Sequence, residues 1–195
     1  MRELTYYVAC SVDGFIAHDD GSHDGFAQDS EYIADLAKTF PETFPAHLRD
    51  VMGIQADNKW FDIVLMGRKT YEVGLNVGLT NPYPHMKQYL FSRSMKASPD
   101  DDIKIVSKDA ATLVKSLKEE MGKGIWLCGG ASLATTLFAE KLVDKLILKV
   151  NPFLMGSGIP LFSGVIKQTA LELTDNKLYD NGVFMSYYQV KTISN

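Results

Sequence analysis

Basic charge, cysteine and long apolar runs are all scarce in this sequence, and each shortage excludes a class of protein. The 195 residues carry 20 lysines and arginines against 24 aspartates and glutamates, a formal net charge of −4. A nucleic-acid binder needs a basic surface to displace counterions, so we expect no nucleic-acid partner. No apolar run approaches the ~20 residues that span a bilayer, and the N-terminus lacks the apolar core of a signal peptide. We therefore expect a cytoplasmic protein without membrane contact.

The two cysteines, Cys10 and Cys128, lie in apolar stretches and lack the Cys-x-x-Cys spacing of a redox or metal motif. We expect two buried free thiols. His18 and His23 lie among aspartates in the polar stretch 18–29, which we expect to be a long loop. Their spacing matches no metal-binding signature, so we expect no metal site.

What is present is an ordinary globular composition, with 46% hydrophobic and 23% charged residues. A chain of this length favours one domain, here residues 1–195. Short apolar runs predict strands at 4–12, 61–66, 87–92, 103–106, 124–128 and 145–151, and a final hairpin of 168–175 and 183–192 around Asn181-Gly182.

Helical spacing predicts a helix from a Ser30 cap to about residue 40, and a short helix over 46–52. A third helix is expected after a Ser107 cap, with Leu113, Val114, Leu117 and Met121 on its apolar face. Strands therefore alternate with helices through the middle of the chain. This order predicts the α/β class, with an open, mostly parallel sheet and an antiparallel C-terminal edge.

Two cations and a hydroxyl follow the apolar strand at 61–66. Gly67 ends the strand, and Arg68, Lys69 and Thr70 come next. If a helix begins at residue 68, its free N–H groups and these side chains converge on one point that suits a phosphate. A solvated Arg-Lys pair on a turn is the alternative. The stretch is not a Walker A loop, because residue 62 is Asp where that motif requires glycine.

A second strand, 124–128, runs into Gly129-Gly130 and then directly into a helix. Paired glycines let a diphosphate approach main-chain N–H groups, although they also suit a tight strand–helix turn. The stretch lacks the G-x-G-x-x-G pattern of dinucleotide-binding proteins. Two anion-receiving strand ends in one domain nevertheless favour a dinucleotide ligand.

In these residues the sequence resembles the dihydrofolate reductase-like superfamily, and more closely the C-terminal reductase domain of the riboflavin biosynthesis proteins. Five stretches match in order: ACSVDGFIA (9–17), IVLMGRKTYE (63–72), YLFSR (89–93), IWLCGGASL (125–133) and PFLMGSGIPLF (152–162). The resemblance implies a three-layer dihydrofolate reductase-like fold, NADPH as cofactor, a small-molecule substrate and a homodimer. The implied activity resembles that of 5-amino-6-(5-phosphoribosylamino)uracil reductase, with hydride transfer to a pyrimidine- or pterin-like substrate.

The resemblance also implies a role for each matching residue. Ala9 and Ile16 would contact the nicotinamide, and Gly67 would allow the backbone to approach the cofactor. The other implied cofactor contacts are Arg68, Lys69, Ser92 and Arg93 to the 2′-phosphate and diphosphate, Thr70 to the diphosphate, and Gly129, Gly130, Ala131, Ser132 and Leu133 around the diphosphate.

The sequence departs from the folate reductases at the proton donor. Those enzymes carry a carboxylate at the start of the helix after the active-site loop, and here that region reads GFAQDSEYIADL. Asp29 is the nearest candidate for a catalytic acid and Glu31 is a second, although Asp29 also suits a helix cap. Asp13 matches an aspartate in the family's loop turn and has an expected structural role. Dihydrofolate reductase proper and a non-catalytic nucleotide-binding protein stay open as alternatives.

Overall fold

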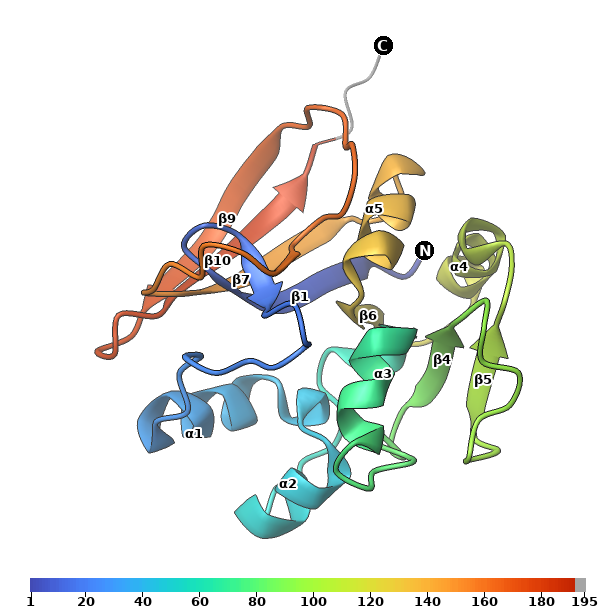
Figure 1. Cartoon of the computed structure of the whole chain (residues 1–195), viewed down its shortest axis with the longest axis horizontal. Helices are drawn as coiled ribbons and strands as arrows, with labels where there is room; N and C mark the ends of the chain where they lie inside the picture. The colour runs from blue at the N-terminus through green and yellow to red at the C-terminus, as the bar shows by residue number, and fades with distance from the viewer. Residues whose placement is uncertain (192–195) are drawn as a thin grey trace.

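One eight-stranded sheet runs through the whole protein (Figure 1). The computed structural model describes residues 1–191. The strand order is β5-β4-β3-β6-β1-β7-β10-β9; the first six strands are parallel, and β10 and β9 are antiparallel to their neighbours. The strands are β1 (Leu4–Ser11), β3 (Phe61–Gly67), β4 (Lys87–Phe91), β5 (Ile103–Val106), β6 (Gly124–Gly129), β7 (Lys145–Asn151), β9 (Leu171–Leu178) and β10 (Phe184–Val190). This confirms the expected α/β class.

Helices cover both faces of the sheet, as strands that are apolar on both faces require. Side chains of α1 and α3 pack with one buried cluster, and side chains of α4 and α5 pack with another on the opposite face. We call these the α1 face and the α5 face. The helices are α1 (Ser30–Thr39), α2 (Ala46–Met52), α3 (Arg68–Leu75), α4 (Ala110–Glu119) and α5 (Ala131–Ala139), with a 3-10 turn η1 (Pro41–Thr43).

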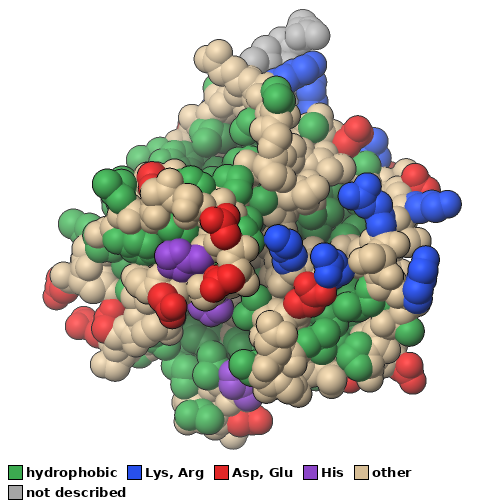
Figure 2. Space-filling model, viewed as in Figure 1, with side chains coloured by type: hydrophobic (Ala, Val, Ile, Leu, Met, Phe, Trp, Pro, Cys, Tyr) green, Lys and Arg blue, Asp and Glu red, His purple; other side chains and the backbone are tan. Residues whose placement is uncertain are grey.

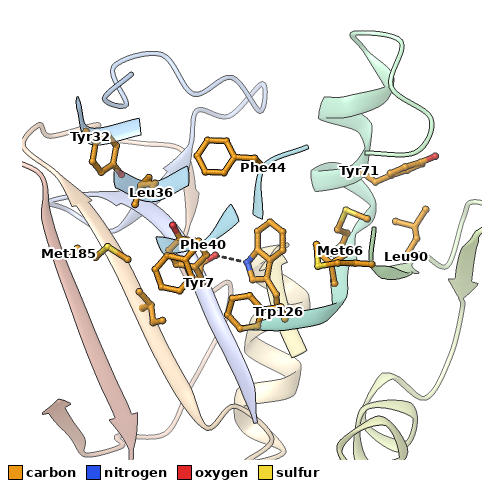
Figure 3. Close-up of a cluster of buried hydrophobic side chains, with 14 of the residues drawn as sticks. Tyr7, Tyr32, Leu36, Phe40, Phe44, Met66, Tyr71, Leu90, Trp126 and Met185 are labelled. Carbon is orange, nitrogen blue, oxygen red and sulfur yellow. Dashed lines mark hydrogen bonds between the residues drawn. The ribbon is translucent and has the colours of Figure 1, made fainter. Parts of the chain in front are cut away.

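Aromatic side chains dominate the core of the α1 face (Figure 3). The rings of Tyr7 and Phe40 stack with centroids 4.7 Å apart, so β1 is joined to the end of α1. The indole Nε1 of Trp126 donates to the Tyr7 carbonyl at 3.0 Å. Each buried aromatic ring removes a large apolar area from water, so this cluster holds α1 firmly against the centre of the sheet.

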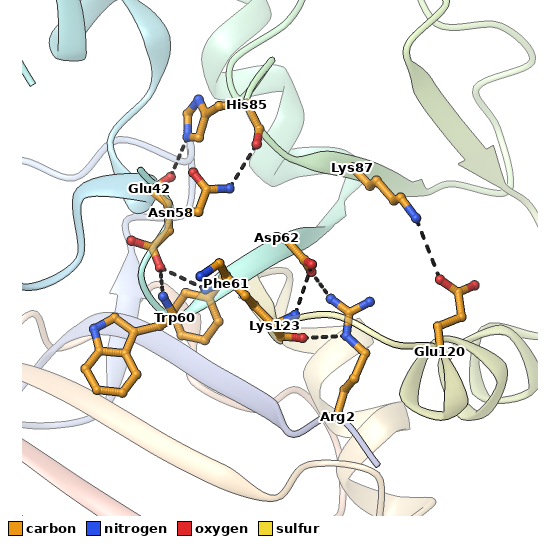
Figure 4. A network of polar contacts seen from close by, with 10 residues as sticks. All are labelled: Arg2, Glu42, Asn58, Trp60, Phe61, Asp62, His85, Lys87, Glu120 and Lys123. Atoms are coloured by element: carbon orange, nitrogen blue, oxygen red, sulfur yellow. Dashed lines mark hydrogen bonds and ion pairs between the residues drawn. The ribbon is translucent and has the colours of Figure 1, made fainter. Parts of the chain in front are cut away.

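Polar contacts tie together the end of the sheet where the parallel strands begin (Figure 4). Glu42 is fully buried, and its carboxylate accepts hydrogen bonds from the backbone N–H groups of Trp60 and Phe61. Arg2 pairs with Asp62, the second residue of β3. A groove of about 690 Å³ remains at this end, lined among others by Arg2, Trp60 and Lys123. The opposite end, where the parallel strands finish, is where ligands bind in open α/β sheets.

Two predicted helix caps were wrong. Asp29, not Ser30, caps α1, because its carboxylate accepts the N–H of Tyr32 at 3.0 Å. Helix α4 begins at Ala110 rather than after Ser107, and Asp109 precedes it with a φ of 55° and no side-chain cap. The helix also ends before Met121, which is 96% exposed and lies off the apolar face that we assigned to it.

The C-terminal hairpin is confirmed, with Asn181-Gly182 in its loop and a positive φ of 82° at Gly182. Residue 192, the expected end of the second strand, lies outside the described residues. A small second sheet pairs β2 (Phe15–Ala17) with β8 (Ile159–Pro160). Within residues 1–191, no helix combines the length and apolar character needed to cross a bilayer.

Candidate functional site

Two helices begin side by side where the central strands β3 and β6 end. Gly67 is the N-cap of α3 and Gly130 is the N-cap of α5, and neither helix has a side-chain cap. The first N–H groups of each helix therefore have no side-chain acceptor, and the helix dipoles add positive potential. The sheet places both N-termini at one edge because β3 and β6 are parallel neighbours. This edge is where ligands bind in open α/β sheets.

Glycine is required at both turns by contact between the two turns themselves. A Cβ on Gly67 would lie 3.2 Å from the Cα of Gly130, and a Cβ on Gly130 would lie 3.1 Å from the Cα of Gly67. Gly130 also has a φ of 105°, which disfavours any L side chain. From the sequence, we expect Gly67 to allow close approach of a ligand, and the pair Gly129-Gly130 to suit either a diphosphate or a tight strand–helix turn. The structure shows the tight turn, with backbone packing that brings two helix N-termini together.

Thr70 belongs to the same cluster. A Cβ on Gly129 would lie 3.0 Å from the Thr70 Oγ1, so the threonine in the first turn of α3 packs against the end of β6. In the first turn of α5, Ala131 and Leu133 are buried and Ser132 is exposed. Ser132 therefore presents a side chain, while Ala131 and Leu133 have only backbone groups to offer.

The cations at this edge are exposed. Arg68 Nη1 pairs with Glu72 Oε1 one helical turn away at 2.7 Å, with the arginine side chain 44% exposed. Lys69 and Arg93 are exposed, and among the described residues neither forms an ion pair. Figure 2 shows most of the visible Lys and Arg side chains on the right of this face and the His side chains on its left. The positive potential is thus local, despite the net negative charge.

Ser92 has a different setting from the other predicted residues. It is 6% exposed, and its Oγ accepts the N–H of Met95 at 2.9 Å. Its own N–H donates to the Val106 carbonyl at 3.0 Å. Ser92 therefore shapes the turn after β4, and the exposed Arg93 is the next residue along that turn.

Asp13 has the structural role expected of it. It accepts hydrogen bonds from the Ser11 hydroxyl at 2.5 Å and from the N–H groups of Met155 and Gly156 at 3.0 Å and 2.7 Å. These bonds stabilise the carboxylate and lower the pKa of Asp13 to about 2. Asp13 thereby joins the turn between β1 and β2 to the loop after β7, and it holds the segment that carries Ile16.

Asp29 lies at the start of α1, whereas the glycine turns precede α3 and α5. Its carboxylate accepts the N–H of Tyr32 and the side-chain amide of Asn181, and these bonds lower the pKa of Asp29. It stands at a groove of about 360 Å³ between α1 and the hairpin loop. An acid with a lowered pKa is ionised at neutral pH and is a poor proton donor. The geometry therefore favours the helix-cap role for Asp29.

The structure places one chemically unusual side chain that the sequence argument did not single out. Lys149 lies in β7 directly opposite Ala9 in β1, and its ammonium lies 4.2 Å from the centre of the Tyr7 ring. Cys128 and Tyr83 lie beside it on the α1 face. The signal was present in the sequence, because Lys149 interrupts the apolar run Leu146-Ile147-Leu148 of a central strand.

The cysteine prediction holds for Cys10, which is 3% exposed. Cys128 is also a free thiol, as predicted, but it is only partly buried. Burial raises the pKa of Cys10 to about 11 and that of Cys128 to about 12, so both thiols stay protonated at neutral pH.

The fold and this edge define an α/β protein with paired helix N-termini at the carboxyl ends of parallel strands. The chain belongs to the RibD C-terminal domain family, whose sequence model matches residues 2–185. The match accounts for nearly the whole described chain, and it confirms the resemblance inferred from the five sequence stretches.

One relative in sequence and two solved structures show what this chain is similar to. The uncharacterized protein YwjB of Bacillus subtilis (strain 168) is 30% identical over 186 residues, covering 95% of this chain and 97% of its own. A putative riboflavin biosynthesis protein from Shewanella sp. PV-4 superposes with a TM-score of 0.72 at 20% identity, covering 98% of this chain and 100% of its own. A pyrimidine reductase-like protein from Corynebacterium diphtheriae gives 0.60 at 14% identity, covering 98% and 92%. These structures share the dihydrofolate reductase-like fold with this chain.

Proposed function

We propose that the protein is an NADPH-dependent reductase of the cytoplasm that transfers a hydride to a small pyrimidine- or pterin-like molecule. The reaction would resemble that of 5-amino-6-(5-phosphoribosylamino)uracil reductase. The observation that carries the proposal is the meeting of two uncapped helix N-termini beside Arg68, Lys69 and Arg93. The family and the pyrimidine reductase-like relative support the reaction class.

The residues at this edge fit a dinucleotide phosphate. The N-termini of α3 and α5 offer backbone donors to a diphosphate, and the closely packed glycines keep that surface free of side chains. Arg68 would take the 2′-phosphate in place of Glu72, because an exposed ion pair contributes only ~0–1 kcal/mol. A charge-assisted hydrogen bond to phosphate contributes about 1.5–3 kcal/mol, so the exchange is favourable.

The chain's own contribution is orientation and exclusion of water. Bound NADPH would supply the hydride. Ala9 lies near the C-terminal end of β1, on the α1 face. Ile16 lies in β2 of the small sheet, next to the turn that Asp13 stabilises. The two positions bracket the end of β1, where we place the nicotinamide. The aromatic core beneath them fixes β1, so the reacting ring would lie on a rigid surface.

Ligand-dependent melting tests the cofactor assignment. A ligand that binds the native state raises the melting temperature with concentration. We expect NADPH to raise it more than NADH at equal concentration, and Arg68→Ala to remove most of that difference. Lys115→Ala is the matched control, because Lys115 is an exposed cation on α4 that pairs with Glu140 at the end of α5. Equal shifts with both cofactors in the unmodified protein would count against NADPH.

Each of the two alternative functions predicts a different assay result. Dihydrofolate reductase activity would appear as loss of absorbance at 340 nm with dihydrofolate and NADPH, and the cap role of Asp29 argues against it. A non-catalytic nucleotide-binding protein would show the NADPH-dependent melting shift without turnover of folates or ring-opened pyrimidine precursors of flavins.

We also propose a homodimer formed through the edge strand β9. All eight of its residues are exposed, and within residues 1–191 it pairs with a strand on one side alone. Leu171, Leu173 and Leu178 are 40%, 50% and 71% exposed. An edge with unpaired backbone groups and exposed leucines is a template for pairing with another strand, and a second copy supplies an identical one.

A further inference from the structure

Lys149 occupies a position in the sheet where a charged side chain costs stability. Its strand lies between β1 and β10, and its residue partners are Ala9 on one side and Met185 on the other. Its ammonium faces the Tyr7 ring at 4.2 Å within the aromatic cluster of the α1 face. The cation–π contact replaces only part of the hydration that a partly buried ammonium loses.

The other lysine in the interior, Lys118, has a charged partner. Lys118 is 5% exposed, and its Nζ binds Asp144 at 2.5 Å and the Leu142 carbonyl at 2.9 Å. Lys149 has no such partner: among the described residues, no carboxylate lies within 4.0 Å of its Nζ. The groups that face it are neutral, so the N–H donors of Nζ are available to hydrogen-bond with a bound ligand.

Every titratable neighbour of Lys149 is uncharged at neutral pH. Cys128 from β6 has its pKa raised to about 12 by burial, and the pKa of Tyr83, beside it in the loop before β4, is raised by burial too. The pKa of Tyr7 from β1 is also raised by burial, with Tyr32 of α1 and Tyr187 of β10 close by. Burial without a counter-charge lowers the pKa of Lys149 to about 8. An ammonium of this acidity is a suitable proton donor near neutral pH.

Solvent reaches this point from the α1 face. Ala9, Cys128 and Lys149 lie in three central strands of the sheet, yet each keeps part of its surface exposed. Neighbouring strands lie ~4.8 Å apart, so a group bound at Ala9 is within reach of the Lys149 side chain. A substrate stacked on the nicotinamide site would therefore meet the ammonium.

We propose that Lys149 is a catalytic residue that protonates the substrate atom adjacent to the carbon that accepts the hydride. The inference rests on the proposed reductase function and adds the proton donor that Asp29 does not provide. It also specifies the substrate chemistry as a C=N or C=O bond. As the carbon gains the hydride, the π electron pair moves to nitrogen or oxygen, which takes a proton from Nζ. The neutral amine then regains its proton from water, and the reduced nicotinamide cofactor is the reductant.

Chemical labelling tests the proposal without any substrate. Acetic anhydride acetylates neutral amines, and mass spectrometry of the labelled protein resolves each lysine across a pH series. We expect Lys149 to label with a midpoint near pH 8 in the native protein, and near its ordinary pKa of 10.5 after denaturation. Saturating NADPH should protect Lys149 several-fold and leave Lys145, which lies in the same strand and pairs with Glu3, unchanged.

Variants complete the test. Lys149→Met and Lys149→Arg should each lower kcat by ~10²–10⁴-fold, since neither side chain transfers a proton near neutral pH, while the melting shift caused by NADPH persists. The alkaline limb of the pH profile near pH 8 should vanish in both. Turnover within about three-fold of the unmodified protein in Lys149→Met would overturn the proposal. So would failure of bound NADPH to protect Lys149, whereas absence of NADPH binding altogether would overturn the reductase assignment itself.

Discussion

At the scale of single residues, two positions depart from what their surroundings prefer. Lys149 is a partly buried cation beside an aromatic cluster, and Gly130 has a positive φ and packs against another turn. Local departures of this kind are expected at functional sites, where stability is given up for chemistry. Each departure has a consequence for stability that can be measured apart from activity.

The charge on Lys149 makes stability depend on pH. Its pKa is lowered from 10.5 to about 8, so between these values the unfolded chain binds a proton that the folded chain does not. The free energy of unfolding, relative to that of Lys149→Met, should therefore rise with pH across this window, by at most about 1.4 kcal/mol per pH unit. Urea unfolding of both proteins from pH 7 to 10.5 measures it. A difference that stays constant would show that Lys149 titrates normally.

Gly130 should tolerate no side chain. Gly130→Ala combines a positive φ of 105° with a Cβ 3.1 Å from the Gly67 Cα, and we expect a loss of about 2–4 kcal/mol in unfolding free energy. Gly78→Ala is the matched control, since Gly78 has a φ of 81° but no heavy atom within 4 Å of its Cβ position. We expect it to cost only about 1 kcal/mol. Equal losses in the two variants would refute the packing contact between the turns.

At the scale of elements, the start of α1 separates two roles for Asp29. Asp29→Asn keeps a capping oxygen, whereas Asp29→Ala removes it. We expect Asp29→Ala to lower the melting temperature and Asp29→Asn to leave it unchanged. Both variants should leave kcat nearly unchanged. A large fall in kcat for Asp29→Asn with unchanged stability would restore the catalytic role that the sequence suggested.

Strands and helices of this protein could be predicted where the pattern is local. The apolar runs at 61–66 and 124–128 mark β3 and β6, because strands buried on both faces need apolar residues throughout. The N-terminus of α4 could not be predicted from the local sequence, because Ser107 and Asp109 are both residue types that can precede a helix. The tertiary fold selected the one that buries Val114 and Leu117.

The candidate site was predictable only in part. Arg68, Lys69 and Thr70 could be found from their place after a strand, and the glycine pair from the turn that it makes. The contact of Gly67 with Gly130 joins residues far apart in sequence, and no local pattern encodes it. Lys149 becomes noticeable once the register opposite Ala9 is known, because a lysine in a strand usually points to solvent.

At the scale of the whole molecule, the exposed edge of the sheet bears on assembly. If β9 pairs with β9 of a second copy, Leu173→Lys should shift the protein from dimer to monomer in light scattering after gel filtration. Leu154→Lys is the control, since Leu154 is 74% exposed outside the strands. A monomer in the unmodified protein at all concentrations would exclude the dimer.

The proposed function depends on NADPH binding at the paired N-termini of α3 and α5, where β3 and β6 end. Calorimetric titration of the unmodified protein and Arg68→Ala with NADPH and NADH tests it most directly. We predict tighter binding of NADPH than of NADH, and a loss of about 10–150-fold in NADPH affinity in Arg68→Ala, the equivalent of one charge-assisted hydrogen bond. NADH affinity should hardly change. No binding of either cofactor, or equal binding of both that Arg68→Ala leaves unaltered, would contradict the account.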